Sequence, residues 1–544
     1  MKRRHIGPVA AGVLVASMLP AVPASAHGGE GPFGRVATVP AYLNSEITDE
    51  AAAEIAAVSS DGRTVIYTDS PGERLGFFDV TDPGKPVPAG VLDLPGEPTS
   101  VAVLGRYALA AVNTSESFAN PSGQLLVVDV KTRAVVRAYE LGGQPDSVAV
   151  APSGRYIAVA VENERDEDVN GGAIPQAPAG WLSVVDTRDW TLSTVALTGL
   201  AAVAPEDPEP EYVSINRRDE AVVSLQENNH LAVVRLRDGK VVNHFSAGAV
   251  TVSGVDTEDD GAITLDGTIT AKREPDGVVW LDDNLFATAN EGDYEGGSRG
   301  FSVFDKRTGR PVFDSGNALE HLAVKYGLYP DSRSDAKGTE PEGVAVGTFG
   351  GTPYLFVNAE RGNFVAVYDV RRPKEPRFVQ LLPTTNGPEG VVTAPSRGLV
   401  VVASEEELPG DGIRASVQIY RFGARGDFPS IVSTKDIGWG ALSGLSAVPG
   451  QRHRLVSVTD SVYTPTRLLT VDTAATPARI VGELTVTKDG APVGYDAEGI
   501  APVPVAAIGW AWRAPPAPPT SWCASGRTVR WPRRCRCRTA SPRR

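Results

Sequence analysis

Short runs of β-branched and aromatic residues recur along the chain, separated by Gly, Asp and Asn. Such apolar runs bounded by turn-forming residues are typical of buried β-strands. A first set of runs lies at residues 65–67, 107–110, 156–159, 221–223, 285–287, 354–357 and 399–402. Each is followed by a second run, at residues 77–80, 127–130, 184–187, 233–236, 303–306, 367–370 and 419–422. The seven pairs predict an all-β fold built from repeated strand units.

A short phrase precedes six of these units: a lead residue, a proline and usually a carboxylate. From proline to proline the steps are 47 to 66 residues. The phrase reads Glu97-Pro98-Thr99, Gln144-Pro145-Asp146, Glu209-Pro210-Glu211, Glu274-Pro275-Asp276, Glu340-Pro341-Glu342 and Gly387-Pro388-Glu389. A strand-rich unit that recurs at such spacing predicts propeller blades. The sequence therefore predicts a seven-bladed β-propeller over residues 54–436, with inserted surface loops at residues 164–180 and 317–337.

The first residues of the chain have the pattern of an export signal. Three basic residues at 2–4 precede an apolar run at 9–22, and Ala24-Ser25-Ala26 has the form of a cleavage site. This pattern predicts a secretory signal peptide over residues 1–26 and a secreted, extracellular protein. No later run reaches the roughly 20 apolar residues of a membrane helix, so no transmembrane segment is predicted. Residues 27–53 are predicted to be an N-terminal linker.

The last segment differs in composition from the rest. Residues 505–544 contain nine arginines, no Asp or Glu, and the three cysteines of the chain, Cys523, Cys535 and Cys537. They show neither strand alternation nor a helical period. Our hypothesis is a reading-frame shift near Pro504, and the alternative is a disordered basic tail. Residues 27–504 lack cysteine, so neither disulfides nor a thiol nucleophile are expected there.

The body of the chain is acidic. The formal net charge is −14, although the leader and the tail are both basic. Nucleic acids are bound by clustered Lys and Arg, so this charge argues against a nucleic-acid partner. It favours cations as ligands.

Two sets of loops are expected to meet at one end of the propeller. Strands within a blade are antiparallel, so the loop before the innermost strand and the loop after the second strand lie at the same end. The second set contains Asn113 and residues 162–164, 226–229, 290–293, 358–361 and 405–407. Hard oxygen ligands without His or Cys favour Ca²⁺. The expected calcium ligands are Glu211, Glu291, Glu342, Glu360, Glu389 and Glu405; alternatively, these carboxylates only solvate the rim.

Other arrangements give weaker signals. His230, His244, His321 and His453 are isolated along the chain and form no metal-binding motif. Arg299 and Lys337 lie among acidic loops, where each is expected either to contact a substrate phosphate or to pair with a neighbouring carboxylate.

Several phrases resemble a known family. Ala289-Asn290-Glu291-Gly292-Asp293, Gly387-Pro388-Glu389-Gly390 and the longer Lys337-Gly338-Thr339-Glu340-Pro341-Glu342-Gly343 are similar to motifs of the bacterial choice-of-anchor I family. The resemblance spans about residues 54–422 and implies a secreted β-propeller. It leaves the chemistry open, because a fold does not fix a function.

A second resemblance begins after the seventh unit. Leu442-Ser443-Gly444-Leu445-Ser446, Ser457-Val458-Thr459-Asp460 and Tyr495-Asp496-Ala497-Glu498-Gly499-Ile500 are similar to the opening of the "esterase-like activity of phytase" family. It implies an incomplete, propeller-like β-rich domain over residues 437–504. By this resemblance, Asp460, Asp496 and Glu498 correspond to acidic site positions.

Two functions of different class follow. The first is a calcium-assisted phosphoesterase or esterase, in which Glu342 or Glu291 activates water toward a small phosphate or carboxylic ester. In the second domain, Asp496 and Glu498 would be the catalytic carboxylates. The alternative is a non-enzymatic extracellular propeller that binds a cell-surface protein or glycan through aromatic residues such as Trp181 or Tyr326.

Overall fold

The structure is a computed structural model that describes residues 31–426, 428–503, 507–512, 523–524 and 527–528. Within these ranges nearly all regular structure is β, and seven four-stranded antiparallel sheets form most of it. The first three sheets are β2 (Ala56–Val58), β3 (Thr64–Asp69), β4 (Arg74–Asp79) and β5 (Val87–Asp93); β6 (Glu97–Leu104), β7 (Tyr107–Asn113), β8 (Gly123–Asp129) and β9 (Ala134–Glu140); and β10 (Pro145–Val150), β11 (Tyr156–Val161), β12 (Trp181–Asp186) and β13 (Thr191–Ala196).

The next three sheets also use four strands each in chain order. They are β14 (Pro210–Ile215), β15 (Glu220–Leu225), β16 (His230–Arg235) and β17 (Lys240–Ser246); β20 (Val278–Trp280), β21 (Leu285–Asn290), β22 (Gly300–Asp305) and β23 (Arg310–Asp314); and β24 (Val344–Phe349), β25 (Thr352–Ala359), β26 (Phe364–Asp369) and β27 (Arg377–Pro383). The seventh sheet combines β28 (Pro388–Ala394), β29 (Leu399–Ser404) and β30 (Ser416–Phe422) with the N-terminal strand β1 (Phe33–Pro40).

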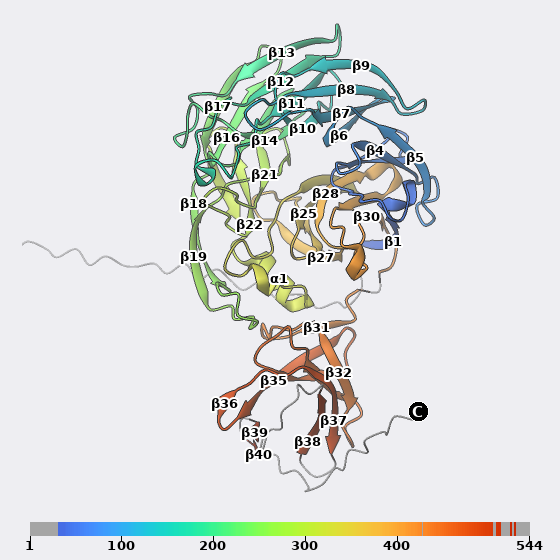
Figure 1. Cartoon of the computed structure of the whole chain (residues 1–544), viewed down its shortest axis with the longest axis vertical. Helices are drawn as coiled ribbons and strands as arrows, with labels where there is room; N and C mark the ends of the chain where they lie inside the picture. Colours follow the sequence, from blue (N-terminus) through green and yellow to red (C-terminus); the bar gives the residue numbers. More distant parts are fainter. Residues whose placement is uncertain (1–30, 427, 504–506, 513–522, 525–526, 529–544) are drawn as a thin grey trace, which may run out of the picture.

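The seven sheets form a closed, propeller-like ring, which Figure 1 shows in colours from blue to orange. The first strand of each sheet packs against the first strand of the next, and β28 packs against β2. Apolar cores fill the spaces between consecutive sheets, so a second strand such as β11 or β29 is buried along its whole length. Burial on both faces explains why these strands have continuous apolar runs rather than alternating ones.

The prediction of a linker over residues 27–53 is wrong at β1. This strand pairs with β30, with Phe33 opposite Phe422. Phe33 is fully buried, and its ring meets that of Phe349 edge-on at 5.0 Å between centroids. The strand could not be assigned from local pattern because its pairing partner lies at the other end of the ring's sequence.

Two elements interrupt the regular sheets. One is a hairpin of β18 (Ala249–Val255) and β19 (Gly267–Lys272), which was not predicted. The other is the helix α1 (Ala318–Tyr326), in the segment predicted as a surface loop; Leu319, Ala323 and Val324 on it are buried. Leu319 and Ala323 are one helical turn apart, which fits packing of one helix face on the ring. Short 3₁₀ helices are Ala41–Asn44, Asn170–Gly172, Asp331–Arg333, Pro395–Arg397 and Pro409–Asp411.

The C-terminal part is a separate, mixed sheet below the ring in Figure 1. It contains β31 (Ile431–Ser433), β32 (Leu442–Ala447), β33 (Arg454–Thr459), β34 (Arg467–Asp472), β35 (Ala478–Lys488), β36 (Ala491–Pro492), β39 (Cys523–Ala524) and β40 (Arg527–Thr528), beside a hairpin of β37 (Ala497–Val503) and β38 (Ala507–Trp512). β31 pairs parallel to β35, so this part begins before the predicted boundary at residue 437. β38 pairs with β37, so the prediction of disorder from residue 505 is wrong there.

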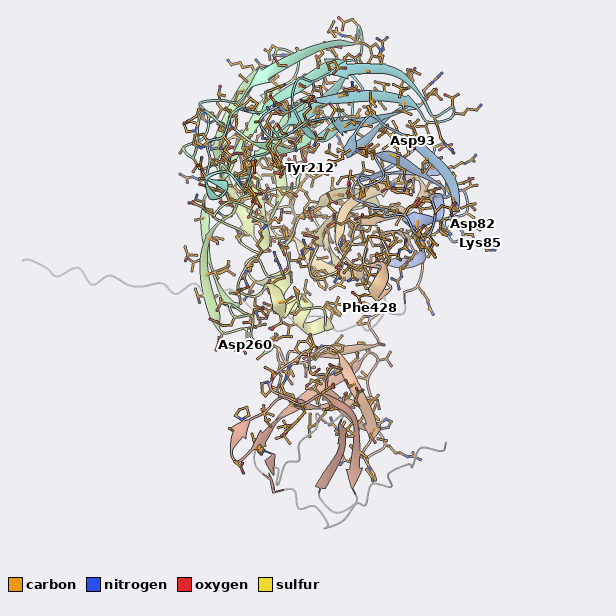
Figure 2. All side chains as sticks on the ribbon, viewed as in Figure 1. Asp82, Lys85, Asp93, Tyr212, Asp260 and Phe428 are labelled. Carbon is orange, nitrogen blue, oxygen red and sulfur yellow. The ribbon has the colours of Figure 1, made fainter. Side chains whose placement is uncertain are left out.

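The C-terminal sheet contacts the ring through α1 and the hairpin. Trp439 Nε1 donates to the carbonyl oxygen of Lys325 at 3.2 Å, and the rings of Tyr326 and Phe428 pack at a tilt with 5.8 Å between centroids. The amide of Thr464 donates to the carbonyl of Gly261 beyond β18. Figure 2 labels Phe428 and Asp260 on the side of the ring that faces this sheet.

Some predictions concern residues outside the described ranges. The signal peptide at residues 1–26 and most of the proposed frameshifted tail belong to this group. Among the residues that the structure describes, no helix is long and apolar enough to cross a membrane.

Candidate metal and catalytic site at one end of the ring

The proline phrases open the innermost strands, as predicted. Pro145, Pro210 and Pro388 are the first residues of β10, β14 and β28, and each is paired with the end of the second strand. The register shifts directly after each of these prolines. Such a bulge takes the next side chain out of the regular alternation and re-aims it.

Side chains at the start of the innermost strands meet at the centre of the ring. A cavity of about 210 Å³ is lined by the equivalent position of every sheet. These positions are Ile55, Thr99, Asp146, Glu211, Asp276, Glu342 and Glu389. Five of the seven are carboxylates, and Glu291 and Tyr212 add to the same wall. Figure 2 labels Tyr212 toward the inside of the ring.

Three groups of carboxylates lie close enough to share a cation. In each, one oxygen per residue lies within 4.8 Å of the others. The groups are Asp276–Glu291–Glu342, Asp146–Glu162–Glu211 and Glu162–Glu209–Glu227. Glu162 belongs to two of them. The sequence predicted Glu211, Glu291 and Glu342 as ligands but placed them in one set, whereas the structure divides them between two groups.

Basic side chains neutralise two of these groups. Lys337 Nζ lies 3.2 Å from Glu291 Oε1 and 3.8 Å from Glu340 Oε1. Arg165, which is 6% exposed, lies 3.2 Å from Glu227 and 3.8 Å from Glu209. Of the two contacts expected for Lys337, a substrate phosphate or a neighbouring carboxylate, the structure shows the pairing with carboxylates.

Burial raises the pKa of the carboxyls around the cavity. For Glu342 burial is the largest cause, and the charges of Glu360 and Glu389 add to it. Burial and the charges of Glu291 and Asp146 raise the pKa of Asp276. The pKa of Glu291 is also raised by burial, but Lys337 opposes the shift. Burial therefore disfavours a bare negative charge on these carboxyls and favours a bound proton or a bound cation.

The remaining predicted ligands form a neighbouring acidic cluster near the seventh sheet. Glu360 has its pKa raised to about 8 by burial, while Arg361 Nη1 lies 3.0 Å from its Oε1. Burial and the charges of Glu54 and Glu405 raise the pKa of Glu389. In the part of the chain that the structure describes, Glu360, Glu389 and Glu405 join none of the compact three-carboxylate groups.

Arg299 is not available to a substrate. It is 2% exposed, and its guanidinium donates to the carbonyls of Asp256, Ser334 and Ala336 and lies 3.5 Å from Glu320. The prediction that Arg299 binds substrate is wrong, because the insertion that carries α1 folds over this side chain.

Sequence reasoning missed several residues of the site. Asp146 and Asp276 stand in the same proline phrases as the chosen glutamates, so the repeat itself was the available signal. Glu162 stands in the second set of loops. His230 and His244 are also not isolated: Nε2 of the first lies 3.1 Å from Nδ1 of the second, because adjacent strands bring them together.

Comparison with known sequences assigns the ring to a family. The profile described as "Choice-of-anchor I domain" matches residues 54–296 and 294–373. The chain belongs to this family. A second profile, "Esterase-like activity of phytase", matches residues 437–510 of this choice-of-anchor I protein. No curated protein matches the chain.

Solved structures with low sequence identity also resemble the choice-of-anchor I chain. Kuenenia stuttgartiensis hydrazine synthase is 15% identical, with 69% of this chain and 97% of that chain covered and a TM-score of 0.44. The RRP9 WD40 repeats are 8% identical, with 72% and 99% covered and a TM-score of 0.49. The Myceliophteria thermophila Cps50 (Swd1) β-propeller domain is 10% identical, with the same coverage and a TM-score of 0.45.

The phytase-like fragment contains the other predicted acidic residues. Asp460 accepts a hydrogen bond from Ser443 Oγ at 2.7 Å, which lowers the pKa of its carboxyl. Asp496, directly before β37, and Glu498, on β37, are exposed. Within the described residues, neither belongs to a three-carboxylate group. The compact acidic groups therefore lie in the choice-of-anchor I ring.

Proposed function

We propose that the ring is a seven-bladed β-propeller, closed by β1, that binds Ca²⁺ in its axial cavity and hydrolyses a small phosphate or carboxylic ester. One observation carries the proposal: the Asp276–Glu291–Glu342 group lies on the wall of a cavity of about 210 Å³. Carboxylate oxygens without His or Cys suit Ca²⁺. Three carboxylates do not complete its coordination, which leaves positions for water and substrate oxygens.

The residues of this group have distinct roles in the proposal. Asp276, Glu291 and Glu342 hold the cation, which supplies counter-charge and polarises the ester oxygen when bound. Glu342 Oε2 is buried without a hydrogen-bond partner, so it is the carboxylate placed to take a proton from water. Lys337 opposes the effect of burial on the pKa of Glu291, and among the described residues it is the basic group in ion-pair contact with this group, where it would meet a substrate oxygen.

Two further points support hydrolysis outside the cell. The family of the C-terminal fragment is described by esterase-like activity, and that chemistry extends to this chain only as part of the proposal. The leader sequence at residues 1–26 supports export. The alternative is a binding scaffold for protein or glycan; its suggested contacts Trp181 and Tyr326 are half-buried against neighbouring side chains, which favours it less.

The test uses the full chain with phytate, an aryl phosphate and an aryl acetate, in Ca²⁺ and then in chelator. We expect turnover that chelation abolishes. Glu342→Gln should lower kcat by about 100-fold or more, as loss of a general base does. Glu375→Gln is the control, because Glu375 is 71% exposed and lies between β26 and β27 at the opposite end. Absence of turnover with all three substrates would reject hydrolysis of these ester types and favour the binding scaffold.

A further inference from the structure

A second group of carboxylates lies on the same cavity, on the neighbouring third and fourth sheets. Asp146 and Glu211 come from the bulges at the start of β10 and β14, and Glu162 directly follows β11. One oxygen from each lies within 4.8 Å of the others. Asp146 and Glu211 line the cavity, and Glu162 closes the group from behind at 5% exposure.

The three carboxylates have no counter-charge of their own. Among the described residues, no Lys, Arg or His lies within the 4.0 Å of an ion pair from Asp146, Glu162 or Glu211. Glu211 Oε2 is buried without a hydrogen-bond partner. This contrasts with the Asp276 group, where Lys337 and the amide of Gln226 both contact Glu291.

The surroundings add further buried carboxyls to this group. Glu209 is fully buried and Glu227 is 2% exposed, and both approach Glu162. Both oxygens of Glu209 and Oε2 of Glu227 have no hydrogen-bond partner. Arg165 contacts Glu227 and Asp293 and is therefore shared among several carboxylates. Uncompensated buried charge is strongly unfavourable, so the group requires either protons or a cation.

We propose that Asp146, Glu162 and Glu211 bind a second divalent cation of the Ca²⁺ type, separate from the cation at Asp276, Glu291 and Glu342. Oxygen-only ligands favour a hard cation, and backbone or water oxygens complete its coordination. The cation links the third and fourth sheets near the ring axis. Because Lys337 competes at the other group and no basic residue competes here, this site takes the cation first.

The experiment is a titration of the metal-free full chain with Ca²⁺ by calorimetry, and with Tb³⁺ by luminescence. Tyr212 follows Glu211 and lines the cavity, so its excitation should sensitise a bound Tb³⁺. We expect two Ca²⁺ equivalents, with the tighter one lost in Glu162→Gln and in Asp146→Asn. Glu342→Gln should lose only the weaker one. Glu206→Gln, an exposed change at the same end, is the control.

The outcomes separate this site from the proposed function. The second site is overturned if Glu162→Gln keeps both Ca²⁺ equivalents. It is also overturned if Glu342→Gln loses all the Ca²⁺ that the wild-type chain binds. If Glu162→Gln does not fold, as judged by circular dichroism, Asp146→Asn gives the same comparison. Hydrolysis can fail while the Asp146 group still binds Ca²⁺, because Glu342 is not one of its ligands.

Discussion

Lys337 Nζ lies 3.2 Å from Glu291 Oε1, on the wall of the axial cavity. The ammonium is 22% exposed and also lies 4.0 Å from Asp293 Oδ1. It therefore acts as a resident counter-charge for the carboxylates that we propose hold a catalytic Ca²⁺. A lysine in this position competes with the cation and, at the same time, opposes the rise that burial causes in the pKa of Glu291.

Replacing Lys337 tests which of these effects is larger. We expect Lys337→Met to bind Ca²⁺ at the Asp276 group several-fold more tightly, because the competing positive charge is gone. Calorimetric titration measures this, with Lys374→Met, a change on the β26–β27 connection, as the control. A weaker Ca²⁺ affinity in Lys337→Met would instead assign the lysine to positioning Glu291.

Calcium should stabilise the ring more at high pH than at low pH. Burial raises the pKa of Asp146, Glu209 and Glu360 to about 8. An acid with a raised folded-state pKa contributes stability below its unfolded pKa near 4 and loses it as pH rises through 8. The metal-free chain should therefore lose stability from pH 5 to pH 8, while bound Ca²⁺ restores it. The difference in Tm with and without Ca²⁺, measured across this range, should grow; a constant difference would contradict the expectation.

The histidine pair in the fourth sheet should make the ring sensitive to acid. Burial, and to a smaller degree the charge of His244, lowers the pKa of His230 from 6.5 to about 4. A base with a lowered folded-state pKa contributes stability above 6.5 that is lost as pH falls toward 4, in total about 3 kcal/mol. Denaturant unfolding at pH 7 and pH 4.5 should show a larger acid loss for wild type than for His230→Gln. His453→Gln, in the C-terminal sheet, is the control, and equal losses in wild type and His230→Gln would refute the effect.

Phe33 should be essential for closing the ring. Its ring is fully buried among Phe349, Tyr354 and Phe356. We expect Phe33→Ala to lower the free energy of unfolding by about 3–5 kcal/mol, the usual cost of truncating a buried phenylalanine. Thr38→Ala changes an exposed residue of the same strand and should have little effect. A loss below 1 kcal/mol in Phe33→Ala would mean that β1 adds little to the ring.

The repeated sheets could be predicted from the sequence because short motifs, close together in the chain, mark each of them. Pro145, Pro210 and Pro388 mark the start of innermost strands, and the carboxylates after them follow the same pattern. The division of those carboxylates into two groups was not readable, because it depends on which neighbouring sheets approach closely. The closeness of Glu162 to Glu211 is set by packing between the third and fourth sheets, which no single repeat encodes.

Other features could not be predicted from the sequence because they depend on contacts between residues far apart in the chain. The His230–His244 contact follows from strand register, which brings together residues that seem unrelated along the chain. Arginine is usually found at the surface, and Arg299 is buried only because the α1 insertion folds over it. Charge and motif show which residue types are present, but burial decides which of them reach a ligand.

The pairing of β1 with β30 also bears on how the protein reaches its folded state. Strand β1 precedes the other strands of the ring in the chain but completes its seventh sheet, so the ring stays open until residue 422 has been made. Contacts of such large sequence separation slow folding and leave intermediates with an unpaired edge. In an open ring, β30 would offer that edge to strands of other molecules. A chain shortened up to residue 32 keeps the closing strand, whereas one that starts after Pro40 should associate through β30.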